Sequence, residues 1–194
     1  MTLRTDNVPT DMWLTDGIVT LRPWQPADAE AIFAAIEESR PELQQWLPAA
    51  GGVTHVNEVR QYIAMTLEWR ETRVAYDFVI ADAQTGGVLG GCGLTQINRN
   101  HHFANLYYWV RCGSARRGVA RRAIRLAARF GMEAVGLARV EIVVQPENTA
   151  SLRAAESAGA VREGVLRNRL TVHDTPGDAV MFSLIPADFG SRRT

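Results

Sequence analysis

One arginine-rich loop of the sequence leads from an aromatic segment into the start of a helix. It reads Ala115-Arg116-Arg117-Gly118-Val119-Ala120 and is followed by Arg121. The first turn of a helix has free backbone N–H groups and the positive end of the helix dipole. Small residues such as Gly118 and Ala120 let an anion approach those groups, and the three arginines could pair with phosphates. The segment therefore predicts a pyrophosphate-binding site.

Arginines on a helix face are ordinarily solvated, and this is our interpretation of Arg125 and Arg129 farther along the same helix. Arginines that precede a helix are different, because the helix dipole favours acidic side chains at that end. Arg116 and Arg117 therefore indicate a bound anion.

A second segment with chemical potential ends a strand and begins a helix. It reads Gln145-Pro146-Glu147-Asn148-Thr149-Ala150-Ser151. Asn148 is well suited to cap the helix, and Ser151 places a hydroxyl in its first turn. Capping and contact with a ligand are compatible roles for Asn148, so both stay open.

Alternating and helical periodicities define the elements that would position these segments. We expect strands at 18–21, 76–81, 88–97, 103–110, 140–144, 161–172 and 179–184, and helices at 27–36, 41–48, 54–67, 118–134 and 149–158. Helices come first, then a three-stranded meander, then a β-α-β-α-β run. This order predicts an α+β fold with three α/β/α layers, in which helices cover both faces of a mixed sheet.

The arginine-rich loop resembles the signature of the GNAT superfamily of N-acetyltransferases, which is Gln/Arg-x-x-Gly-x-Gly/Ala. Ala115 departs from it at the first position. Asn148-x-x-Ser151 is similar to the form found in RimJ/RimL-like members, the relatives of ribosomal-protein N-terminal acetyltransferases. Leu21-Arg22-Pro23-Trp24 and Trp46-Leu47-Pro48 also look like these enzymes, so the resemblance spans about 18–184.

The resemblance implies the GNAT fold, with a mostly antiparallel sheet of about six or seven strands in which a bulge splays the fourth strand from the fifth. It implies acetyl-CoA as co-substrate and no metal. The coenzyme-binding residues would be Trp109, Val110 and Arg111, acting through main chain, Arg116, Arg117, Gly118, Val119, Ala120 and Arg121 at the pyrophosphate, and Asn148 and Ser151 along the pantetheine arm. Ser151 would also be catalytic, as the group that steadies or protonates the leaving thiolate.

The reaction that this implies is direct attack of a primary amine on the thioester in a ternary complex. Many relatives carry a glutamate base on the fourth strand, but Asn105 occupies that position here, and a tyrosine common on the later helix is replaced by Ala155. The base stays unassigned among His101, His102, Glu38, Glu42 and a water-mediated route. The acceptor side would be built by Trp24, the segments 39–47 and 74–78 and the last hairpin near His173. Within them, Trp46 and Tyr76 could line an aromatic pocket or fill the core.

Other functional classes find less support in the sequence. All 21 cationic side chains are arginine, which excludes mechanisms that need an enzymic lysine. The run Gly86-Gly87-Val88-Leu89-Gly90-Gly91-Cys92-Gly93 is not a G-x-G-x-x-G dinucleotide motif and instead indicates a bulged or closely approached strand. The four histidines lack metal-binding spacing, and a net charge of +0 argues against nucleic acid as a partner.

We expect residues 1–194 to form a single domain, with its core at about 18–185 and an irregular segment at 1–16. No segment has the length or hydrophobicity of a membrane span, so a cytoplasmic protein is expected. The acceptor is a protein N-terminal amine or a small-molecule amine, and a homodimer is compatible with the sequence. The alternative is a sensor or subunit that binds acyl-CoA with slow turnover or none, because Asn105 removes the usual base.

Overall fold

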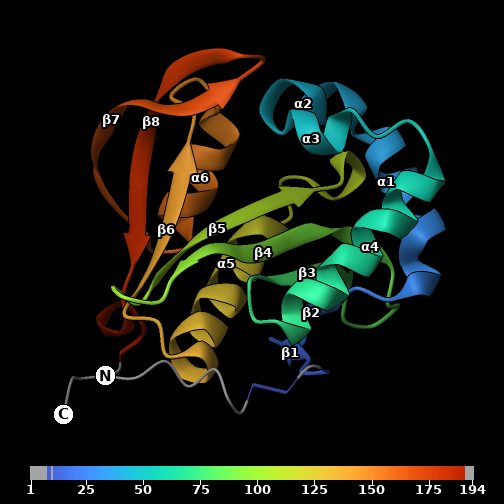
Figure 1. Cartoon of the computed structure of the whole chain (residues 1–194), viewed down its shortest axis with the longest axis horizontal. Coiled ribbons are helices and arrows are strands. Elements are labelled where there is room, and N and C mark those ends of the chain that lie inside the picture. The colour runs from blue at the N-terminus through green and yellow to red at the C-terminus, as the bar shows by residue number, and fades with distance from the viewer. Residues whose placement is uncertain (1–7, 10, 191–194) are drawn as a thin grey trace.

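The computed structural model describes residues 8–9 and 11–190, within which eight strands form one sheet (Figure 1). The strands are β1 (Leu14–Thr15), β2 (Val19–Pro23), β3 (Tyr76–Asp82), β4 (Val88–Asn98), β5 (Phe103–Val110), β6 (Arg139–Val144), β7 (Val161–Val172) and β8 (Thr175–Leu184). Their order is β1-β2-β3-β4-β5-β6-β8-β7. Only β5 and β6 pair in parallel, which confirms the predicted mixed, mostly antiparallel sheet.

Helices cover both faces of the sheet, as predicted. They are α1 (Ala29–Glu38), α2 (Arg40–Trp46), α3 (Pro48–Gly51), α4 (Val56–Glu71), α5 (Val119–Phe130) and α6 (Thr149–Ser157). Figure 1 shows α4 in front of the sheet and α5 behind it. The face of α5 that carries Ala123, Ala127 and Phe130 is buried, and the Phe130 ring lies 5.2 Å from that of Phe78 on β3. On the other face, Ile32 and Ile63 pack with Trp109 of β5.

The eighth strand is β1, which lies in the segment 1–16 that we expected to be irregular. It pairs with β2 through a tight turn over 16–19, in which the Asp16 N–H donates to Val19 O at 3.2 Å. The Asp16 carboxylate accepts backbone hydrogen bonds from Ile18 at 3.0 Å and Val19 at 2.9 Å, and Gly17 has a φ of +85°. An Asp-Gly pair is a strong hairpin signal, so this correction has a cause that is visible in the sequence.

The fourth and fifth strands expected from the sequence are β5 and β6 of the structure, because β1 was not expected. They pair over only three residues and then diverge. Phe103, Ala104 and Asn105 lie opposite 139–141, and no later residue of β5 pairs with β6 in the described structure. Figure 1 shows the two strands side by side at one end and far apart at the other. The expected splay is confirmed, but β5 pairs residue for residue with β4 from Asn105 to Val110, so the expected bulge in β5 is wrong. The irregularity lies in β4, between Thr95 and Asn98.

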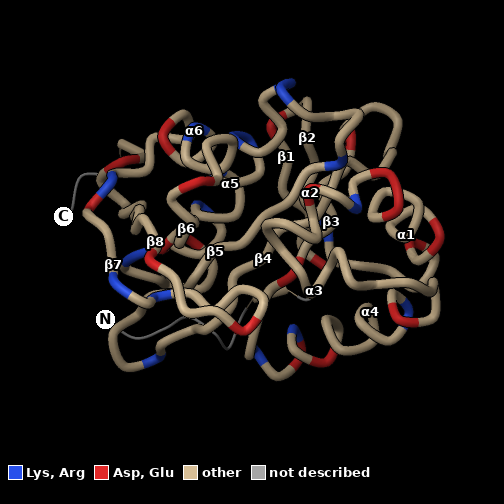
Figure 2. Tube along the Cα trace, turned by 90° about the horizontal axis from the view of Figure 1, so that it is seen from above, with Lys and Arg blue, Asp and Glu red and all other residues tan. Residues whose placement is uncertain are grey.

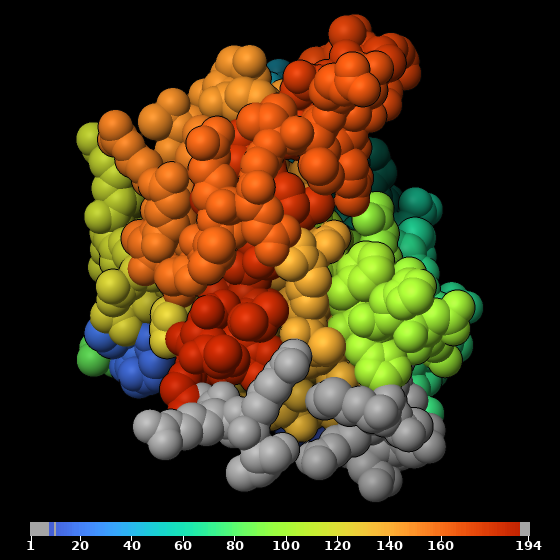
Figure 3. Space-filling model, turned by 90° about the vertical axis from the view of Figure 1, so that its left-hand side faces the viewer, coloured from blue at the N-terminus to red at the C-terminus, as the bar shows by residue number. Residues whose placement is uncertain are grey.

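Charged residues of both signs are distributed over the whole molecule. Figure 2 shows basic and acidic segments interspersed over the chain rather than gathered on one face. Figure 3 shows that β7 forms much of one side of the molecule and that the β7–β8 hairpin projects beyond the sheet. Among the described residues, no helix has the length and apolar character needed to cross a membrane.

Candidate active site

The N-terminus of α5 is open and has no acidic side chain in its first turn. Gly118 caps the helix with φ 75° and ψ 11°, and a Cβ placed there would meet no atom within 4 Å. The amide groups of Val119, Ala120 and Arg121 have no partner within the helix, because the residues four positions before them lie outside it. The Val119 side chain is buried and Ala120 is half-buried, so both offer main chain to a ligand. This arrangement could hold a pyrophosphate.

Three exposed arginines surround this helix end. Arg116, Arg117 and Arg121 form no ion pair with any residue between 11 and 190 that the structure describes. The neighbouring Arg122, by contrast, contacts Asp16 Oδ2 at 2.6 Å. Unpaired guanidinium groups beside free amides are what an anion-binding site requires.

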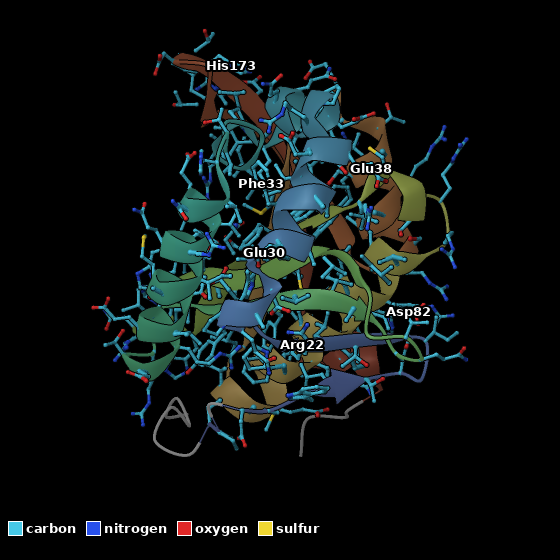
Figure 4. All side chains as sticks on the ribbon, turned by 90° about the vertical axis from the view of Figure 1, so that its right-hand side faces the viewer. Arg22, Glu30, Phe33, Glu38, Asp82 and His173 are labelled. Atoms are coloured by element: carbon cyan, nitrogen blue, oxygen red, sulfur yellow. The ribbon has the colours of Figure 1, made fainter. Side chains whose placement is uncertain are left out.

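Arg111 has a different role from the other arginines of the loop. Its Nε donates to Glu38 Oε2 at 2.5 Å, and the Gly113 backbone N–H donates to Glu38 Oε1 at 2.8 Å. Figure 4 shows Glu38 at the end of α1, beside this loop. The Gly113 hydrogen bond, and after it the Arg111 hydrogen bond, lowers the pKa of Glu38. The ionised Glu38 carboxylate therefore holds the loop in place. Because its pKa is lowered, it accepts a proton less readily and is a poor candidate for a base.

We expect Glu38→Gln to weaken acetyl-CoA binding by about two- to fivefold, because an exposed ion pair contributes little and the amide keeps one acceptor. Calorimetric titration measures this. Since the pKa of Glu38 is lowered, the effect should be complete above its ordinary pKa of 4.5 and disappear as the pH falls through the lowered value. Glu30→Gln is the control, because Glu30 also pairs with an arginine but lies away from the loop (Figure 4). Equal effects of both variants would contradict the role of Glu38.

The main chain that faces the gap between β5 and β6 follows from the strand register. The Arg111 N–H donates to Leu89 O on β4, and residues alternate along a strand. Trp109 and Arg111 therefore direct their N–H and C=O groups to β4, whereas Tyr108 and Val110 direct theirs into the gap. Of the three residues expected to offer main chain there, only Val110 does so. The Trp109 side chain is buried beneath α1 and α4.

On the face of the sheet that carries α6, a tyrosine of β5 meets the predicted catalytic serine. The hydroxyl groups of Tyr108 and Ser151 lie 2.8 Å apart, and the Tyr108 hydroxyl is 3.0 Å from the Ser151 carbonyl oxygen. Asn148 caps α6, because its Oδ1 accepts from the Ser151 N–H at 3.0 Å. That bond leaves the Asn148 amide NH₂ free to donate to a ligand. Burial raises the pKa of Tyr108 to about 12, so its phenol stays protonated at neutral pH.

The sequence analysis did not identify Tyr108 as a functional residue. A tyrosine is absent from position 155 of α6, where Ala155 is buried, but β5 supplies a phenol to the same helix from across the gap. The signal was available as strand alternation, which places Tyr108 and Tyr107 on opposite faces. It could not show which helix each phenol meets.

The two histidines among the suggested bases lie away from the diverging end of β5. His101 and His102 precede β5, roughly 20 Å along the strand from Val110. Glu42 lies by the Cys112 thiol, whose pKa is raised first by burial and then by Glu42 among its neighbours. Asn105 lies at the last paired position of β5, opposite Glu141 on β6. His101 and His102 therefore do not replace the carboxylate that Asn105 lacks, whereas Glu42, beside Cys112 and close to the end of β5, stays a candidate.

A cavity of about 520 Å³ lies between α2–α3 and the tip of the β7–β8 hairpin. It is lined by Gln44, Gln45, Pro48, Gly52 and His173. Figure 4 shows His173 at this tip, near the α2–α3 region. The lining includes amide and imidazole groups and no carboxylate.

Two aromatic residues that we considered for the acceptor side belong to the core. Tyr76 is buried against Phe130 of α5, with ring centroids 5.2 Å apart, and Trp24 is buried beside Tyr62, with centroids 5.4 Å apart. Trp46 is half-buried at the end of α2 and is still a candidate. Within the described ranges, no group of three histidine, cysteine or acidic residues could hold a metal ion.

Comparison with known proteins places this arrangement in a family context. The model of the acetyltransferase (GNAT) domain matches residues 19–161. An N-acetyltransferase from Bacillus licheniformis, p20, whose activity is not characterised, is 27% identical over 88% of this chain and 94% of its own. A Vibrio cholerae structure provisionally described as a ribosomal-protein-serine acetyltransferase superposes with a TM-score of 0.78 at 28% identity, covering 96% and 100% of the two chains. Mycobacterium smegmatis RimJ in complex with CoA-disulfide gives a TM-score of 0.84 at 23% identity, covering 98% and 93%.

Proposed function

This chain belongs to the GNAT family of acetyltransferases, and from that premise we propose that it transfers the acetyl group of acetyl-CoA to a primary amine. The observation that carries the proposal is the divergence of β5 from β6, with the Tyr108–Ser151 hydroxyl pair beside it. The open N-terminus of α5, which follows β5 in the chain, supports a site for the pyrophosphate of the coenzyme.

The residues that would hold acetyl-CoA fit its chemistry. The first amides of α5 would bind the pyrophosphate together with Arg116, Arg117 and Arg121, which form no ion pair within the described residues. The main chain of Val110 and the amide NH₂ of Asn148 would bind the polar groups of the pantetheine arm. When bound, the thioester supplies an activated acetyl group, and Ser151 would donate a hydrogen bond to the sulfur.

Direct attack by the amine is favoured over a covalent acetyl-enzyme. Burial raises the pKa of the Cys112 thiol, which disfavours the thiolate that a nucleophile needs. Cys92 is fully buried in the core and its thiol is inaccessible. The chemistry of these side chains therefore supports attack within a ternary complex.

We propose a protein N-terminal amine as the acceptor, since the relatives with described substrates include a provisional ribosomal-protein-serine acetyltransferase. The cavity lined by Gln44, Gln45 and His173 offers neutral groups that suit the amide backbone of an extended peptide. A small cationic amine would be expected to meet carboxylates there instead.

The experiment is thiol release from acetyl-CoA with a peptide that begins with serine, compared with the same peptide carrying a blocked N-terminus and with a small aliphatic amine. We expect release with the free peptide only. Release with the small amine alone would show that the acceptor is a small-molecule amine and would refute the peptide acceptor. Micromolar acetyl-CoA binding without release by any amine would instead identify an acyl-CoA-binding sensor and refute the proposed reaction.

A further inference from the structure

A buried carboxylate lies on the face of the sheet that α1 and α4 cover, and the proposed coenzyme site does not use it. Asp77 on β3 is 1% exposed and pairs with Gly93 on β4, which in turn pairs with Tyr107 on β5. A Cβ at position 93 would lie 2.7 Å from Asp77 Oδ1 and 2.7 Å from Tyr107 Cε1. The glycine therefore leaves the space in which the carboxylate and the phenol meet across β4.

Asp77 is held by two phenols through one of its oxygens. The hydroxyl of Tyr107 donates to Asp77 Oδ1, the hydroxyl of Tyr62 on α4 lies 3.3 Å from the same oxygen, and the two hydroxyls are 3.2 Å apart. Asp77 Oδ2 is buried and has no hydrogen-bond partner among the residues described. A buried charged oxygen without a partner is costly, so its retention calls for a functional explanation.

The electrostatic surroundings favour uptake of a proton by Asp77. Burial raises the pKa of the Asp77 carboxyl, and hydrogen bonds from Tyr107 and Tyr62 and the charge of Arg70 offset part of that rise. The titratable and charged groups that face it are Tyr62 and Arg70 on α4, Cys92 on β4 and Tyr107 on β5. A carboxyl with a raised pKa is a better base near neutral pH than an exposed one.

Tyr107 connects this carboxylate to the strand that carries the reaction. It follows Asn105 by two residues, so both side chains lie on the same face of β5, and it precedes Tyr108, which lies on the opposite face. Tyr107 and Tyr62 are half-buried whereas Asp77 is buried, so the phenols separate the carboxylate from solvent. With Tyr108 and Ser151 on one side of the thioester, an amine would approach from the side of Tyr107.

We infer that Tyr107 takes the proton of the attacking amine and passes its own phenolic proton to Asp77, which replaces the carboxylate missing at position 105. The inference rests on the proposed acetyl transfer. The ammonium form of the amine first gives one proton to Tyr107 Oη while the Tyr107 proton moves to Asp77 Oδ1, so Asp77 ends neutral and Tyr107 is unchanged. The neutral amine nitrogen then bonds to the carbonyl carbon as the carbon–sulfur bond breaks, Ser151 donates a hydrogen bond to the sulfur, and the second proton lost by the nitrogen reaches the thiolate through solvent. Asp77 releases its proton to solvent before the next turnover.

The test compares Tyr107→Phe and Asp77→Asn with the wild type, with the serine peptide as probe. We expect kcat to fall by about 10²-fold or more, with the Kd for acetyl-CoA unchanged. The rate of each variant should rise with pH up to the pKa of the peptide amine, about 8, because only amine that is already neutral can react. A purely structural role would not produce this pH profile. Acetyl-CoA hydrolysis, in which water must lose a proton in the same way, provides a second readout without a peptide.

Tyr76→Phe is the matched control, because it removes a buried hydroxyl without a partner from the residue next to Asp77, on the other face of β3. It should leave the rate and its pH profile unchanged. Asp77→Asn tests the carboxylate. If that variant fails to fold, Tyr107→Phe alone decides, because it removes only the hydroxyl oxygen and keeps the packing of the ring.

Two results would overturn the inference. A wild-type rate and pH profile for Tyr107→Phe would refute the relay while leaving the proposed acetyl transfer intact. Loss of rate in Glu141→Gln but not in Tyr107→Phe would assign the base to Glu141, which lies opposite Asn105 and is hydrogen-bonded to Arg139 Nε at 2.8 Å. Failure of the wild type to bind acetyl-CoA would instead refute the function on which the relay rests.

Discussion

Gly118→Trp should abolish measurable acetyl-CoA binding, with an increase in Kd of at least about 100-fold, equivalent to ~2.7 kcal/mol. The Cβ of residue 118 points into open space at the mouth of α5, so an indole there would occupy the position of the pyrophosphate. It would also cover the amides of Val119 and Ala120, which offer the helix dipole to the anion. Calorimetric titration of acetyl-CoA into both proteins measures the change.

Backbone strain must be separated from blocking of the site. Gly118 has a left-handed conformation, which costs a side chain about 1–2 kcal/mol. Gly190 has nearly the same conformation, with φ 77° and ψ 7°, and a Cβ there also meets no atom within 4 Å. Gly190→Trp should therefore lose similar stability and keep full binding. If Gly118→Trp binds acetyl-CoA like the wild type, the proposal that the N-terminus of α5 binds the coenzyme is wrong.

Much of the fold could be predicted because its signals are local. The meander β3–β4–β5 alternates with clear turns, and the glycines of β4 indicated a close approach that the structure has: a Cβ on Gly90 would lie 2.1 Å from Trp109 O. The divergence of β5 from β6 could be expected only through the family resemblance. Nothing in the sequence of Leu106 to Val110 shows that one edge of the strand lacks a partner, because that depends on how β8 holds β6.

The candidate site was predictable where a single segment builds it and unpredictable where distant segments meet. Gly118 and Asn148 lie in such segments, and the predicted cap at Asn148 is confirmed. The contact of Tyr108 with Ser151 joins residues 43 positions apart, and that of Tyr107 with Asp77 joins residues 30 apart. Asp77 did give a local signal, since a charge within the apolar run of β3 is unusual. Its meaning required the structure.

Ser151→Ala should lower kcat for acetyl transfer by about 10²-fold, and Tyr108→Phe by about tenfold to 10²-fold, with small changes in the Kd for acetyl-CoA. The serine hydroxyl would donate to the developing thiolate, and the Tyr108 phenol would donate to the serine in turn. Because burial raises the pKa of Tyr108 to about 12, the wild-type rate should not fall between pH 7 and about 10 through loss of this donor. Thiol release with the serine peptide measures each rate.

Ser157→Ala and Tyr76→Phe control for these changes. Ser157 lies on α6 with its hydroxyl bonded to the Ala154 carbonyl at 2.9 Å, away from β5, and Tyr76 is a buried tyrosine in the core. Both controls should retain the wild-type kcat.

The double variant decides whether the two hydroxyls work as one unit. If Tyr108 acts only through Ser151, removing the phenol from a protein that already lacks the serine hydroxyl should cost little more. The double variant should then resemble Ser151→Ala, with a coupling close to the full effect of Tyr108→Phe. Effects that multiply would mean that Tyr108 reaches the sulfur independently. In that case the tyrosine missing from α6 would be replaced directly by the one on β5, and Ser151 would be a second donor rather than the link between them.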